Sequence, residues 1–103
     1  MSSIDMDKVR REQLRWILLL ALDHARPYGA AEVVLLATVQ GVYPDATALE
    51  TRRQLSYLED RRLVEVQRSA GGQWRAELTR YGVDIAEYTI DCEAGIARPA
   101  KYW

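Results

Sequence analysis

One stretch of the chain decides the fold, residues 47–79, which read TALETRRQLSYLEDRRLVEVQRSAGGQWRAELT. Thr47 and Glu50 have the spacing of a capping box, in which the Thr47 hydroxyl accepts the backbone N–H of Glu50. The Glu50 carboxylate then reaches back to the N–H of Thr47. Pro44 and Asp45, just upstream, favour a turn. The pattern predicts a helix that begins after Thr47 and runs to about Arg61.

This predicted helix is amphipathic, because residues three and four apart share one face of a helix. Arg53 and Tyr57 point away from the apolar stripe, and Gln54 and Arg61 lie beside them. Leu49 lies off the stripe. The stripe that we expect to be buried consists of Ala48, Thr51, Leu55 and Leu58.

Two short strands are predicted after the helix, at 63–68 and 73–78. The residues between them, Ser69-Ala-Gly-Gly72, suit a hairpin turn because glycine accepts a positive φ. Alternation along the second strand leaves Arg75 and Glu77 facing outward. The side chains expected to pack on the helices are Trp74, Ala76 and Leu78.

Three further helices complete the predicted elements, at 6–25, 30–40 and 80–88, with a short strand at 89–92. Trp16 is expected to be a core residue of the first helix. The apolar run 16–22 covers seven residues, whereas a membrane span needs about 20. The expected inner face of the first helix is Leu14, Ile17, Leu18, Ala21, Leu22 and Ala25. That of the second is Val33, Val34, Leu36 and Ala37.

Three helices followed by a β-hairpin form the arrangement of a winged helix, an α+β fold with a fourth helix after the wing. The motifs Tyr57-Leu-Glu-Asp-Arg-Arg-Leu-Val64 and Leu78-Thr-Arg-Tyr-Gly82 resemble the winged helix-turn-helix regulators of the PadR and MarR type. Arg62 stands where that family often has glycine. The resemblance covers about residues 30–88 and implies DNA binding and transcription regulation.

A second resemblance concerns the end of the chain. The run 95–103, GIARPAKYW, is similar to the end of small proteins carried by Mu-like bacteriophages, and this implies no established activity. We divide the chain into a winged-helix domain at 1–88 and a C-terminal extension at 89–103, packed on the domain or on a partner. A chain of 103 residues suffices for one modest core.

Charge is distributed unevenly along the chain. The formal net charge of −1 argues against a strongly basic, non-specific nucleic-acid binder. Residues 47–80 nevertheless hold seven arginines against five acidic residues, and residues 81–97 hold four acidic residues and no cation. A basic segment followed by an acidic one is typical of a DNA-facing and a DNA-averted side. A mixed, solvated surface is the alternative.

The sequence gives little support for catalysis. We expect that the protein is not an enzyme and that it binds no cofactor, metal or small-molecule ligand. His24 is the single histidine and is expected to be solvated or to cap a helix end. Cys92 is the single cysteine, lacks an activating motif, and fits a reducing cytoplasm. Phosphate-binding glycine loops and metal-ligand spacings are absent from the sequence.

Two functions remain from the sequence. In the first, the protein is a small bacterial or phage transcriptional regulator that binds double-stranded DNA. In the second, it is a winged-helix adaptor that binds protein without DNA. Net charge and the acids beside the reading face stand against the first. For DNA binding, Arg53, Gln54 and Tyr57 are expected to read bases, and Arg52, Arg61, Arg68 and Arg75 to hold phosphates.

Assembly is the last expectation. The run 16–22 offers more apolar surface than one face of a three-helix body can bury. We expect a homodimer built from the first helix, the helix at 80–88 and the aromatic end Tyr102-Trp103. The alternative is a monomer in which the first helix is the central one.

Overall fold

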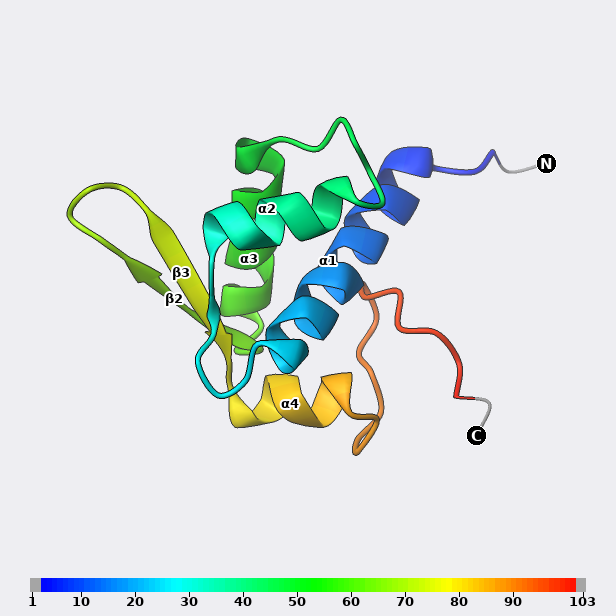
Figure 1. Ribbon diagram of the computed structural model, residues 1–103. Helices are drawn as coiled ribbons and strands as arrows, with labels where there is room; N and C mark the ends of the chain where they lie inside the picture. The colour runs from blue at the N-terminus through cyan, green and yellow to red at the C-terminus, as the bar shows by residue number, and fades with distance from the viewer. Residues whose placement is uncertain (1–2, 102–103) are drawn as a thin grey trace.

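Four helices and a three-stranded antiparallel sheet make up residues 3–101, the part of the chain that the computed structural model describes. This α+β architecture is compatible with a winged helix. In Figure 1 the β2–β3 hairpin projects to the left beyond the helices, and α4 lies at the bottom, next to the base of the hairpin. The elements are α1 (Met6–His24), β1 (Ala30–Ala31), α2 (Glu32–Gln40), α3 (Ala48–Asp60), β2 (Val64–Arg68), β3 (Trp74–Leu78) and α4 (Arg80–Ala86).

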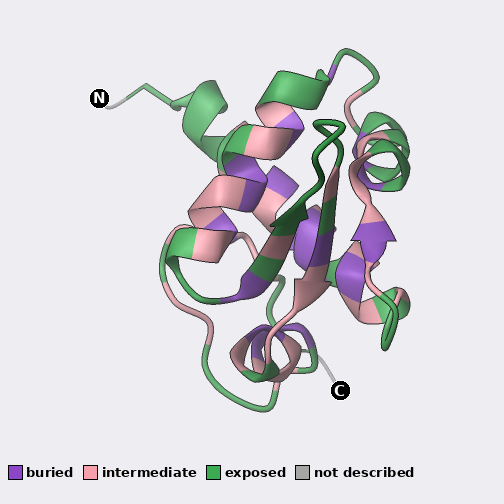
Figure 2. Ribbon diagram, turned by 90° about the vertical axis from the view of Figure 1, so that its left-hand side faces the viewer, coloured by how far each residue is buried: buried purple, intermediate pink, exposed green. Residues whose placement is uncertain are grey.

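The core is built around α1. Asp5 caps this helix by accepting the backbone N–H of Lys8 at 3.0 Å. Trp16 is buried, as predicted, and its ring meets that of Tyr88 edge-on with centroids 6.0 Å apart. Figure 2 shows the buried segments between the helices and the sheet, whereas the hairpin tip is exposed. The buried residues of α1 are Leu14, Trp16, Leu18, Leu19 and Leu22.

The prediction for the inner face of α2 was wrong for Val33, Val34 and Ala37, which are exposed, whereas Leu36 packs against the core as predicted. Leu35 and Val39 are fully buried, whereas Val33 and Val34 are 69% and 55% exposed. The helix is apolar on nearly every side, so its sequence contains no polar face that fixes its rotation, and packing against α1 and α3 decides it. The helix also starts later than predicted, because 30–31 form β1.

The sheet has the order β1-β3-β2, so β3 is its central strand. Val66 and Ala30 flank Ala76 from the two sides, and Ala76 is buried beneath the helices. Trp74 and Leu78 are partly buried on the same side, and Arg75 is exposed, as the alternation predicted. The two-residue strand β1 was missed, because nothing in two alanines indicates a partner 46 residues away.

A residue with a left-handed backbone conformation follows α3 and turns the chain into β2. Arg62 has φ +63°, and its N–H donates to the Glu59 carbonyl at 2.9 Å. The Leu63 N–H donates to the Leu58 carbonyl at 2.9 Å, and both leucines are fully buried. These bonds form a Schellman motif, whose left-handed position usually holds glycine. Arg62 therefore adopts the conformation that the related pattern assigns to glycine.

A second joint connects the hairpin base to α4. The Thr79 hydroxyl donates to the Arg62 carbonyl at 2.7 Å and accepts the N–H of Gly82 at 3.1 Å, which caps α4. A Cβ on Gly82 would overlap the Leu63 carbonyl oxygen. The Thr-x-x-Gly spacing thus serves two contacts, a helix cap and a close approach of α4 to the start of β2.

The chain after α4 returns along α1, as Figure 1 shows. The Ala97 N–H donates to the Glu12 carbonyl at 3.1 Å, and Ile96 is buried. The predicted strand at 89–92 is wrong, because these residues form a bend and then irregular chain. Tyr102 and Trp103, which we expected at a dimer contact, lie outside the described residues. Among residues 3–101, no helix is long and apolar enough to cross a membrane.

Candidate nucleic-acid interface

The outward row of α3 consists of Leu49, Arg53, Ser56 and Asp60. Leu49 is 59% exposed, Arg53 and Asp60 are exposed, and Ser56 is partly so. The helix starts at the predicted cap, where the Thr47 hydroxyl accepts the Glu50 N–H at 3.1 Å. The side chain of Arg53 has no ion pair or hydrogen bond within residues 3–101, so its guanidinium is available to an external acceptor.

Gln54 does not belong to this row, and its predicted base-reading role is wrong. The residue is 6% exposed, and its amide oxygen accepts Arg15 Nε–H at 2.9 Å. Gln54 follows Thr51 by three positions and precedes Leu58 by four, which places it on the buried face. That spacing was the signal available in the sequence, but the polarity of glutamine obscured it.

Tyr57 is also held inside the protein. Its ring is partly buried against the core, and two guanidinium groups lie over it. The Arg15 Cζ is 3.5 Å from the ring centroid, and the Arg61 Cζ is 5.1 Å from it. Arg15 also donates to the Gly95 carbonyl at 2.9 Å. The ring therefore joins α1, α3 and the C-terminal segment, which favours a packing role, and its reading of bases stays a prediction.

A second aromatic ring with two arginines over it connects the hairpin to the helices. Arg52 donates from Nε and Nη2 to the Glu32 carboxylate at 2.6 and 2.5 Å, and from Nη2 to the Gly72 carbonyl at 2.6 Å. Its Cζ lies 4.6 Å from the Trp74 ring centroid. Glu32 also accepts the Trp74 backbone N–H at 3.0 Å. Glu32 thus joins the start of α2 to the hairpin.

Arg68 also contacts this ring, with its Cζ 4.3 Å from the Trp74 ring centroid. It donates to both oxygens of Glu59 at 2.8 and 3.0 Å. The Arg68 guanidinium holds the pKa of Glu59 below its usual range, and Arg52 does the same for Glu32. Both carboxylates therefore stay ionised at neutral pH and neutralise the arginines beside them.

The remaining predicted phosphate ligands differ in their surroundings. Arg61 lies 3.6 Å from Glu93 and is half exposed. Arg75 is exposed on β3 and donates to the Tyr28 carbonyl at 2.7 Å, with no carboxylate paired to it among the described residues. Sequence reasoning missed Arg62, which is exposed and has no ion pair within residues 3–101. The signal was its place in the turn that links α3 to β2.

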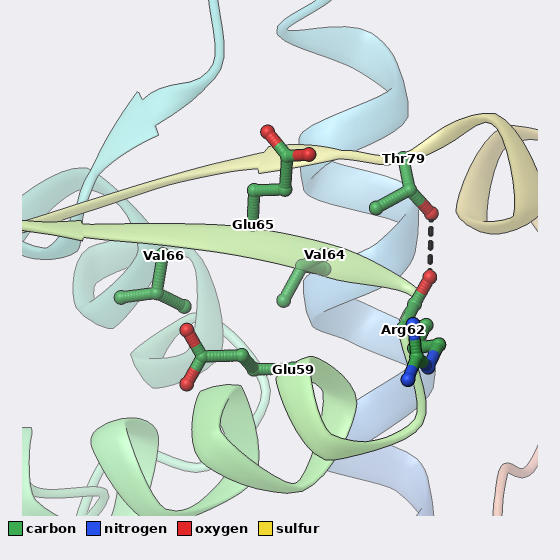
Figure 3. A pocket seen from close by; sticks show the side chains of 6 residues that line it. All are labelled: Glu59, Arg62, Val64, Glu65, Val66 and Thr79. Atoms are coloured by element: carbon green, nitrogen blue, oxygen red, sulfur yellow. Dashed lines mark hydrogen bonds between the residues drawn. The ribbon is translucent and has the colours of Figure 1, made fainter.

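A shallow groove of about 420 Å³ runs between the end of α3 and β2. In Figure 3 the Glu59 side chain rises from α3 towards Val66, and the dashed line joins the Thr79 hydroxyl to the Arg62 carbonyl. In the same view the Glu65 side chain extends to the other side of β2, away from Glu59. Arg62 is the one cation of the lining, and the Glu59 carboxylate is paired with Arg68 from outside the groove.

The described residues offer no grouping of three metal-ligating side chains. Burial raises the pKa of the Cys92 thiol, which keeps it protonated and poorly nucleophilic. His24 is exposed at the end of α1.

Comparison with known proteins gives a match of fold. The chain is similar to a protein of Ralstonia eutropha JMP134, whose crystal structure names it a "putative DNA-binding protein". The two share 22% sequence identity with a TM-score of 0.60, over 86% of this chain and 100% of that one. No protein-family model matches the sequence, and no curated protein matches it significantly.

Proposed function

We propose that this protein is a small winged helix-turn-helix DNA-binding protein that regulates transcription in a bacterium or its phage. In this assignment α2 and α3 form the helix-turn-helix, α3 enters the major groove, and the β2–β3 hairpin is the wing. The name of the Ralstonia protein supports DNA binding, and the PadR- and MarR-like motifs support regulation. The resemblance to proteins of Mu-like phages supports the phage context.

The exposed face of α3 carries this proposal. Arg53 stands at its centre without an internal partner within residues 3–101, and guanidinium groups bind guanine edges through two parallel hydrogen bonds. Leu49 precedes it by one turn, and an exposed apolar side chain on a reading helix suits a thymine methyl group. Ser56 follows by one turn and can donate or accept. The base-reading set becomes Leu49, Arg53 and Ser56.

Phosphate contacts fall to cations that no carboxylate neutralises among the described residues. Arg75 on the wing and Arg62 at the α3–β2 turn meet this condition. The sequence assigned Arg52 and Arg68 to phosphate contacts, but their guanidinium groups pair with Glu32 and Glu59. We propose that these two arginines position the wing.

The test is binding to a labelled mixed-sequence duplex of about three helical turns across a salt series. A DNA binder loses affinity steeply as salt rises. Arg53→Ala should weaken binding by about 1–3 kcal/mol and leave the melting temperature unchanged. Arg80→Ala removes the same charge from an exposed site on α4 and is the control. Binding that is absent, or indifferent to salt, contradicts the proposal.

A protein-binding adaptor is the second candidate, and the pairing of the arginines favours it. Arg52, Arg61, Arg68 and Arg80 each have a carboxylate within 4.0 Å, and Asp60 lies on the exposed row of α3. A face so neutralised attracts DNA weakly. The same salt series separates the two functions, since an adaptor leaves the duplex unbound.

A further inference from the structure

One large apolar side chain is exposed on the proposed reading helix. Leu49 lies in the first turn of α3 and is 59% exposed, whereas Leu55 and Leu58, the other leucines of this helix, are fully buried. Arg53 follows Leu49 by four residues, so the two side chains are neighbours on one face, about 6 Å apart along the helix axis. Together they offer an apolar surface and a guanidinium group to one ligand.

The acidic residues nearest to this pair are turned aside or lie farther along the helix. Glu50 is the acidic residue of the first turn of α3. Arg10 of α1 donates from Nε and Nη2 to the Glu50 carboxylate at 2.7 and 2.8 Å and neutralises it. Asp60 lies seven residues beyond Arg53, about 10 Å along the helix. The electronegative edge of a base can therefore approach the Arg53 guanidinium.

An apolar side chain beside a guanidinium matches the major-groove edge of a pyrimidine followed by a guanine. Guanine presents N7 and O6, which accept two hydrogen bonds from one guanidinium. Thymine presents a methyl group at C5, which an apolar side chain contacts, whereas cytosine has a hydrogen atom there. In the step 5′-TG-3′ this methyl group lies next to the guanine edge, because successive bases of one strand are about 3.4 Å apart. A 5-methylcytosine carries the same methyl group at the same carbon.

We propose that Leu49 and Arg53 together recognise the C5 methyl group of a pyrimidine that precedes a guanine. Arg53 binds the guanine, and Leu49 covers the methyl group. Thymine and 5-methylcytosine are then accepted at this position, and unmethylated cytosine is bound more weakly. Methylation of the cytosine in a 5′-CG-3′ step therefore converts a weak site into a strong one. This specificity rests on the proposed function, because it concerns the DNA that α3 binds.

Selection from a pool of randomised duplexes, followed by base replacement, tests this specificity. The selected duplexes should contain a 5′-TG-3′ step. One of them is then synthesised with thymine, uracil, 5-methylcytosine or cytosine at the pyrimidine of that step, each opposite its matching base. Thymine differs from uracil by the methyl group alone, and so does 5-methylcytosine from cytosine. Loss of the methyl group should weaken binding about threefold to tenfold in each of the two comparisons.

A pair of variants shows whether Leu49 senses the methyl group. Leu49→Ala should bind the thymine and uracil duplexes equally well. Val42→Ala is the matched control, because Val42 is also 59% exposed but lies just after α2, outside the proposed DNA contacts. This control should keep the wild-type preference for thymine. Circular dichroism melting checks that both variants fold, and the two duplexes with the wild-type protein carry the test if one does not.

The outcomes separate this specificity from DNA binding itself. Equal binding of the thymine and uracil duplexes by the wild-type protein overturns the methyl recognition and leaves the proposed function in place. Selected duplexes without a pyrimidine–guanine step overturn it as well, and so does a folded Leu49→Ala variant that keeps the preference for thymine. A wild-type protein that binds no duplex overturns the proposed function and the methyl recognition together.

Discussion

Two aromatic rings of this protein each have two arginine guanidinium groups over them, and the two sites differ in charge. The wing junction consists of Trp74 with Arg52 and Arg68, whose guanidinium groups pair with Glu32 and Glu59. The α1 junction consists of Tyr57 with Arg15 and Arg61. There Arg15 donates to the neutral oxygens of Gln54 and Gly95, and Arg61 lies 3.6 Å from Glu93.

The difference shows that a count of arginines along a segment does not predict whether their charge is available at the surface. The wing junction is neutral, because each guanidinium has its own carboxylate. One of these carboxylates, Glu32, comes from 20 residues earlier in the chain. The α1 junction retains a positive charge, but desolvation by burial lowers the pKa of Arg15 and the ring covers the guanidinium. Neither junction presents the free cationic surface that the sequence count predicted.

The largest effect is expected from removing the ring of the α1 junction. Tyr57→Ala should lower the free energy of unfolding by about 3 kcal/mol, because the ring is partly buried and covers a guanidinium without a carboxylate. Urea denaturation measures this loss. Tyr57→Phe keeps the ring and should cost less than about 1 kcal/mol. An unchanged stability in Tyr57→Ala would return this residue to the surface role predicted from the sequence.

A pair of glycines separates contact from backbone strain. Gly95 has φ +95°, and a Cβ there would overlap the Tyr57 hydroxyl oxygen. Gly72 at the hairpin tip has φ +86°, with nothing within 4 Å of such a Cβ. Gly72→Ala should cost about 1 kcal/mol from strain alone, and Gly95→Ala about 1–2 kcal/mol more. Equal losses in thermal unfolding would mean that the Gly95 contact contributes nothing.

Acid should weaken the wing junction selectively. Arg52 and Arg68 hold the folded-state pKa of Glu32 and Glu59 below the unfolded value of about 4.3. Their contribution to stability is therefore present above that value and disappears as the pH falls through the folded-state pKa. Glu32→Gln should cost about 1 kcal/mol at pH 7 and progressively less towards pH 3.

The control for this pH dependence comes from the other junction. Gly95→Ala disturbs contacts to neutral oxygens, so its cost should be the same at both pH values. Urea titrations of both variants at the two pH values supply the comparison. A pH-independent cost of Glu32→Gln would show that the Arg52 pair contributes nothing through its charge.

The smallest effect is expected at Arg61. Its guanidinium is half exposed and lies farther from Glu93 than hydrogen-bonding distance, so Arg61→Ala should change stability by less than about 0.5 kcal/mol. Arg52→Ala removes a bidentate pair and should cost several times more. A double-mutant cycle with Glu93→Gln measures the Arg61 pair directly. Coupling above about 1 kcal/mol there would make the two junctions alike.

The helix and strand bounds of the hairpin half could be predicted closely because local chemistry fixes them. Thr47 caps α3, and Thr79 caps α4, each through its own hydroxyl. One half of the predicted capping box did not form as expected, because the Glu50 carboxylate binds Arg10 at 2.7 and 2.8 Å. That partner lies 40 residues away and leaves no local pattern.

The errors share a physical origin in long-range contacts. The predicted rotation of α2 about its axis was wrong because an apolar helix can bury any of several faces. The neighbouring elements decide which face is buried. Gln54 was assigned to the surface because its burial depends on Arg15, which lies on another helix. The DNA-binding assignment of Arg52, Arg53, Arg61, Arg68 and Arg75 stays a prediction, and of these Arg53 and Arg75 keep cationic groups without a carboxylate among residues 3–101.

Thr79 anchors the base of the hairpin, so the length of the hairpin can vary without a change in the rest of the molecule. The register between β2 and β3 is fixed at the base of the hairpin. There the Thr79 N–H donates to the Leu63 carbonyl at 3.1 Å, and the Thr79 hydroxyl donates to the Arg62 carbonyl. Residues added at 70–71 need only close a longer loop, and each doubling of loop length costs about 0.6 kcal/mol. The reach of the hairpin can therefore change between relatives while the helices and their core remain as they are.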